Sequence, residues 1–123
     1  DQWRLTTNLT GVTAQFITAN LEQIDSSGQG TLGSAMTESS GVFTFPSTGI
    51  YLVQAEFSFT NREGGTNRSI NSCGLRIQFD SDDNTFTTRA EQRTASNNTG
   101  AEAEFNASCQ AIIDVTDVSN QFF

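Results

Sequence analysis

Apolar and polar residues alternate at a period of two along most of the chain, a pattern typical of half-buried β-strands. The clearest case is Gly41–Phe59, which reads GVFTFPSTGIYLVQAEFSF. The short alternating segment Val42–Phe45 leads into a turn that contains Pro46 and Gly49. A longer segment, residues 50–60, then places its apolar residues on one face. This stretch predicts two strands joined by a tight turn.

The same alternation predicts further strands at residues 1–9, 73–79, 86–95 and 101–115. Residues 13–24 alternate only loosely. Residues 26–40 are rich in Gly, Ser and Thr, which predicts a loop. No segment has a convincing helical period, and no linker or internal repeat divides the chain. We therefore expect residues 1–123 to form a single all-β domain, an antiparallel sandwich of two sheets.

The positions that share the inward parity of these strands form the predicted core of the sandwich. They are Phe43, Phe45, Tyr51, Val53, Phe57, Leu75, Ile77, Phe79, Phe105, Ile113 and Val115. As a core residue, Phe57 should cost about 3–5 kcal/mol of stability when truncated to alanine.

Three large apolar residues have the opposite, outward parity. Ile50 and Leu52 alternate with Tyr51 and Val53, and Ile112 precedes the core residue Ile113. Two explanations remain open. These residues form a subunit interface, or the chain's own N-terminal segment covers them.

The charge composition argues against several classes of function. The net charge is −8, with no Lys and no His, and the six Arg are scattered. A chain this acidic lacks the basic surface patch that binding to nucleic acid or to an anionic membrane requires. Without His or Lys, a Ser–His–acid triad, a Schiff base and a His metal site are all excluded. The remaining carboxylate pair, Glu102 and Glu104, shares the outward face of one strand and predicts a solvated surface.

An acidic turn offers one candidate metal site. Asp80, Asp82, Asn84 and Glu91 have the spacing of positions 1, 3, 5 and 12 of a helix-flanked calcium loop. Thr85 stands where that loop needs Gly, and the predicted flanking elements are strands. Either the four residues bind calcium, the only cofactor the sequence suggests, or they form a polar turn between two strands.

Two cysteines, Cys73 and Cys109, share the inward parity of their strands. They are too few for a disulfide scaffold. They are either buried thiols that pack as small apolar side chains or a single disulfide that joins the two strands. Neither is expected to be catalytic, because no His is present to generate a thiolate.

The motif G-x-F-x-x-P-x-x-G-x-Y, formed by Gly41, Phe43, Pro46, Gly49 and Tyr51, resembles the core motif of the tumour-necrosis-factor and complement-globular-head superfamily. Residues 107–117 resemble the family's penultimate stretch, with Thr116 in place of its Gly.

This resemblance implies a jelly roll that assembles as a homotrimer, with the last strand lying centrally in the inner sheet. No segment for that strand follows Phe123. We therefore expect either that the sequence is part of a longer polypeptide or that another chain or domain supplies the strand.

The composition, rich in Asn, Ser and Thr, is similar in style to that of structural proteins of tailed bacteriophages. The expected function is a non-enzymatic structural module of a virion: a head fibre, a capsid decoration or a tail-fibre domain. Its partners would be copies of itself and other virion proteins or the host cell surface, with no nucleic acid and no membrane. The alternative is a secreted recognition module that binds a cell-surface protein or carbohydrate through its loops.

Overall fold

The computed structural model describes residues 1–10, 15–61, 73–81, 84–95 and 103–123. Within these residues the chain is all β, as the alternation predicts, and none of them is helical. The strands are β1 (Trp3–Leu5), β2 (Leu21–Gln23), β3 (Thr37–Ser39), β4 (Val42–Thr44), β5 (Gly49–Asn61), β6 (Cys73–Ser81), β7 (Phe86–Thr94), β8 (Ala103–Val115) and β9 (Gln121–Phe122).

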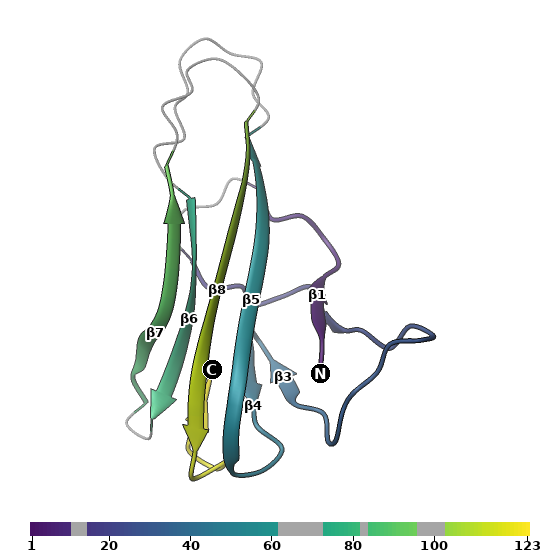
Figure 1. The fold of residues 1–123 in the computed structure, drawn as a ribbon, viewed down its shortest axis with the longest axis vertical. Helices are drawn as coiled ribbons and strands as arrows, with labels where there is room; N and C mark the ends of the chain where they lie inside the picture. The colour runs from purple at the N-terminus through teal and green to yellow at the C-terminus, as the bar shows by residue number, and fades with distance from the viewer. Residues whose placement is uncertain (11–14, 62–72, 82–83, 96–102) are drawn as a thin grey trace.

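Three antiparallel sheets are formed by these strands. The largest has five strands in the order β3-β4-β9-β6-β7, and β5-β8 and β1-β2 are two-stranded. The long β5 and β8 run side by side along the length of the molecule (Figure 1). Their ladder extends from the pair Gly49–Val115 to the pair Asn61–Ala103 without a register shift.

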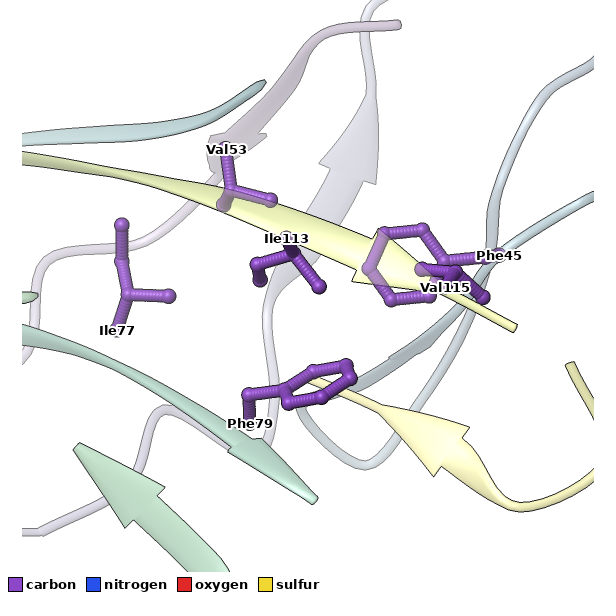
Figure 2. Packing of buried hydrophobic residues seen from close by; sticks show 6 residues of the cluster. All are labelled: Phe45, Val53, Ile77, Phe79, Ile113 and Val115. Carbon is purple, nitrogen blue, oxygen red and sulfur yellow. The ribbon is translucent and has the colours of Figure 1, made fainter. Parts of the chain in front are cut away.

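The core lies between the β5–β8 pair and the five-stranded sheet. Six of the eleven predicted core residues are buried and form one cluster: Phe45, Val53, Ile77, Phe79, Ile113 and Val115. Val53, Ile113 and Val115 come from the β5–β8 pair and meet Ile77 and Phe79 of β6 (Figure 2). The prediction of the core from parity is therefore confirmed for these six.

The other five predicted core residues, Phe43, Tyr51, Phe57, Leu75 and Phe105, are half-buried. Phe57 contacts Phe59, at 6.0 Å between ring centroids. The cost of about 3–5 kcal/mol expected for truncating Phe57 applies to a fully buried Phe and is too high for this position.

The prediction of a continuous loop over residues 26–40 is wrong at its end, because Thr37–Ser39 forms β3 and pairs with β4. Ser40 and Gly41 join the two strands with φ angles of 54° and 85°. Positive φ at both central residues is the requirement of the tightest hairpin turns. A side chain at Gly41 would also collide with the Ile17 carbonyl, so only glycine fits there.

The C-terminal residues form an interior strand of the five-stranded sheet, which the alternation did not predict. β9 pairs with β4 on one side and with β6 on the other. Phe43 and Phe123 exchange backbone hydrogen bonds, and their rings stack at 5.0 Å. The Gln121 side chain accepts hydrogen bonds from the Thr116 and Asp117 N–H groups, at 2.7 and 3.0 Å. These contacts fix the turn between β8 and β9.

Candidate functional site

The strongest candidate site is the side of the β5–β8 pair that faces away from the core, which we call the outer face. Every side chain on it is exposed. β5 contributes Ile50, Leu52, Gln54, Glu56, Ser58 and Thr60, and β8 contributes Glu104, Asn106, Ser108, Gln110, Ile112 and Asp114.

Ile50, Leu52 and Ile112 gather at one end of the outer face. Leu52 lies directly opposite Ile112 in the ladder, and Ile50 lies two residues from Leu52 on the same strand. Their exposed fractions are 76% for Ile50, 64% for Leu52 and 76% for Ile112. They are three of the five large hydrophobic side chains that are exposed among the described residues. The structure thus brings together the three outward-facing residues for which the sequence left open a subunit interface or a cover by the N-terminal segment.

The residues of the N-terminal segment that the structure describes do not cover Ile50, Leu52 and Ile112, which was the alternative explanation. The exposed fractions of Ile50, Leu52 and Ile112 are too high for covered side chains. Trp3 instead packs edge-on against Phe43 of β4, at 5.2 Å between ring centroids. A cluster of exposed apolar residues of this kind is typical of a contact surface for another molecule.

The rest of the outer face is polar and acidic. Ser58 donates a hydrogen bond from its hydroxyl to the Asn106 side-chain oxygen, at 2.7 Å. Glu56, Glu104 and Asp114 supply three negative charges, and no residue of the outer face is basic. Asp114 lies directly opposite Ile50, beside the apolar cluster, whereas Glu56 and Glu104 lie further along the strands. The outer face therefore combines one apolar cluster with acidic side chains along its whole length.

The candidate calcium ligands are not brought together by the described residues. Asp80 is buried on β6, opposite Phe86 of β7. Glu91 lies opposite Arg76, which is four residues from Asp80 along β6, or about 13 Å at the usual strand rise. Asp82 lies outside the described residues, as does Glu102 of the carboxylate pair. The described residues contain no cluster of three or more His, Cys, Asp or Glu side chains suited to a metal ion.

Glu91 instead belongs to a charged group that the sequence did not reveal. It pairs with Arg93 on its own strand and with Arg76 across the ladder, the latter at 3.6 Å. The hydrogen bond from Arg93, together with the charges of both guanidinium groups, holds the pKa of Glu91 below its usual value. Opposite charges that face each other across two strands attract, so the pair of Arg76 and Glu91 could have been predicted if the register of β6 and β7 had been known. The sequence does not reveal that register.

Cys73 and Cys109 are both free thiols and are half-buried. Burial raises the pKa of each, and in Cys109 a backbone hydrogen bond from Ile77 partly opposes that rise. Cys73 lies four residues from Ile77 along β6, about 13 Å at the usual strand rise. The structure therefore contains two free thiols and no disulfide.

A hollow opens to solvent where β7 approaches β8. It is lined by Gln54, Ala90, Glu91, Gln92, Ser108, Cys109 and Gln110. The Gln92 side chain reaches across from β7 and accepts a hydrogen bond from the backbone N–H of Ser108, at 2.5 Å. Most of the side chains here are neutral and polar, the Cys109 thiol is protonated and Glu91 is paired with arginines.

No protein-family model matches this chain, and neither the curated proteins nor the solved structures include a significant match to it. The residues that the structure describes include no helix with the length and hydropathy needed to cross a membrane.

Proposed function

We propose that this chain is a non-enzymatic structural module that self-associates as a homotrimer through its outer face. The observation that carries the proposal is the exposure of Ile50, Leu52 and Ile112 at one end of that face. Burying three such side chains against a neighbour would contribute about 1.5–3 kcal/mol each at most. Cyclic assembly would bring the same patch of each copy to the symmetry axis.

A jelly roll is the architecture that we propose for the module. The β5–β8 pair packs across one core from the five-stranded sheet, and that sheet places the chain's last strand, β9, between β4 and β6. Non-sequential strand order of this kind is usual in jelly rolls. The motif from Gly41 to Tyr51 adds the sequence resemblance to trimeric jelly rolls.

The setting that we propose is a virion, where the module would serve as a head fibre, capsid decoration or tail-fibre domain. Support comes from the composition and from the net charge of −8, which disfavours contact with packaged nucleic acid and suits an outward-facing position. Immunogold labelling of intact particles tests this setting. Absence from purified particles, together with secretion by cells, would favour the recognition module instead.

The assembly is tested by light scattering coupled to size exclusion. The chain should elute with the mass of a trimer, and Ile112→Asp should shift it to a monomer, because it places an unpaired charge in a buried contact. Leu32→Asp is the matched control, since it places the same charge at another exposed apolar residue that lies outside the outer face. A monomeric mass for the unmodified protein would refute the proposal.

A further inference from the structure

The free edge of β5 offers a second kind of contact, made by backbone groups that lie beside the side chains of the outer face. β5 pairs with β8 along one edge, from Gly49 to Asn61. Among the described residues, no strand pairs with its other edge. Long open edges are usually protected by Pro, Lys, a bulge or a covering loop. β5 has no Pro, no Lys and no bulge between Gly49 and Asn61.

The hydrogen bond to Gln92 shows which backbone groups face this edge. The Ser108 N–H donates to Gln92 of β7, so it points away from β5. Ser108 is directly opposite Glu56, and because its N–H points away from β5 the two form a non-hydrogen-bonded pair. In such a pair both residues direct their N–H and C=O groups away from each other. The ladder has no register shift, so the alternation holds throughout. The groups at the free edge are therefore those of Ile50, Leu52, Gln54, Glu56, Ser58 and Thr60.

We propose that the free edge of β5 receives an extended strand from a partner protein, with apolar residues opposite Ile50 and Leu52 and Lys or Arg opposite Glu56. Strand addition of this kind takes its affinity from backbone hydrogen bonds and its specificity from alternate side chains. Ile50 and Leu52 at the start of the edge and Glu56 near its middle determine which side chains the incoming strand presents.

A second copy of β5 suits this edge poorly. Antiparallel self-pairing over Ile50–Thr60 sets Ile50 opposite Thr60 and Leu52 opposite Ser58, so that neither apolar residue meets an apolar partner. The acidic outer face has no basic residue to pair with Glu56. Charge complementarity therefore favours a basic strand from a different protein.

The test uses a fluorescein-labelled synthetic strand as long as Ile50–Thr60, with Val opposite Ile50 and Leu52 and Lys opposite Glu56. Fluorescence anisotropy with the full chain should show saturable binding. Gln54→Pro removes one edge N–H and leaves the hydrogen bonds to β8 intact, so it should weaken binding by about tenfold or more. Gln54→Ala keeps the N–H and is the matched control, expected to bind like the unmodified chain.

A charge exchange provides the second, independent measurement, because it does not alter the backbone. Glu56→Lys should weaken binding of the Lys peptide by about threefold, and a peptide with Glu at that position should restore it. Absence of binding to the full chain would overturn the proposal, as would equal binding to Gln54→Pro. Equal affinity for the Lys and Glu peptides would overturn the choice of a basic partner. The mass of the chain, measured separately by light scattering, tests the proposed trimer and not the strand addition, so the two proposals can fail independently.

Discussion

Phe45 is the residue whose packing contributes most visibly to the core. Its exposed fraction is 2%, and its ring lies 4.7 Å from that of Tyr51, 5.3 Å from that of Phe123 and 6.4 Å from that of Phe79. These neighbours come from β5, β6 and the segment that follows β9. Phe45 therefore packs against β5, β6 and Phe123 at once.

Phe45→Ala should destabilise the protein by about 3–5 kcal/mol, because it removes a fully buried ring and leaves a cavity among aromatic neighbours. Phe57→Ala should cost less, about 1–2 kcal/mol, since that ring is half-buried. Urea denaturation measures both. Leu32→Ala, at a side chain that is 97% exposed, should change stability by less than about 0.5 kcal/mol. Equal losses of stability in the Phe45→Ala and Phe57→Ala variants would contradict the difference in burial between the two rings.

The two thiols predict a dependence on alkaline pH. Burial raises the pKa of Cys73 and Cys109 above the ordinary value of 9.0, so the folded state keeps protons that the unfolded chain has already lost. This contribution to stability is fully present below pH 9.0 and is lost as the pH rises through the folded-state pKa values.

Iodoacetamide should therefore modify both thiols slowly at neutral pH, with a rate that rises only above the pH expected for an unperturbed cysteine. In urea the profile should return to the ordinary midpoint. A folded-state midpoint below that of the unfolded chain would show that a nearby group stabilises the thiolate, which the structure does not predict.

At the scale of elements, the turn between β8 and β9 depends on one side chain. Gln121 is 9% exposed, and its side-chain oxygen accepts from two consecutive backbone N–H groups, those of Thr116 and Asp117. Its amide nitrogen donates to the Thr116 hydroxyl at 3.3 Å. The amide thereby satisfies backbone donors that β8 leaves without strand partners.

Gln121→Ala should cost about 1–3 kcal/mol, because it leaves backbone donors without their partner in a partly buried position. Ser119→Ala is the control. Ser119 is exposed, and the hydrogen bond from its backbone N–H to Asp117 does not need the hydroxyl. Thermal unfolding compares the two variants. A loss for Gln121→Ala no greater than that for Ser119→Ala would mean that β9 holds the turn without this amide.

The elements that the sequence predicts well are those whose pattern is long. β5 and β8 alternate over many residues, so parity alone identified both their buried faces and the exposed Ile50, Leu52 and Ile112. β3 and β9 were missed for a physical reason. The Thr-Glu-Ser sequence of β3 has no apolar alternation, and β9 is two residues long and exists because β4 and β6 pair with it.

The periodicity of the sequence could not predict contacts between strands that are distant along the chain. The ion pair of Arg76 with Glu91 and the hydrogen bond from Ser108 to Gln92 depend on register and on the approach of β7 to β8. The spacing that suggested a calcium loop fails for the same reason. In an antiparallel hairpin, residues face each other only when they lie at matching distances from the turn. Asp80 lies beside the turn opposite Phe86, whereas Glu91 lies further along opposite Arg76.

At the scale of the whole molecule, the net charge opposes the self-association that we propose for Ile50, Leu52 and Ile112. The chain carries a charge of −8, and the outer face itself includes Glu56, Glu104 and Asp114. Copies that meet through this face bring like charges together, which costs free energy at low ionic strength. The balance between the patch and these acids should therefore respond to salt.

Raising NaCl from about 20 mM to about 300 mM shortens the Debye length from roughly 20 Å to roughly 6 Å. Self-association, measured by sedimentation equilibrium, should tighten by about threefold or more as repulsion among the outer-face acids is screened. The variant Glu56→Gln, Glu104→Gln, Asp114→Asn should associate more tightly at low salt and lose most of this dependence. Glu22→Gln is the control, because it removes one charge from β2, where Glu22 pairs with Arg4. If salt instead loosened the assembly, ion pairs rather than Ile50, Leu52 and Ile112 would hold the copies together, and the contact would lie on a different face.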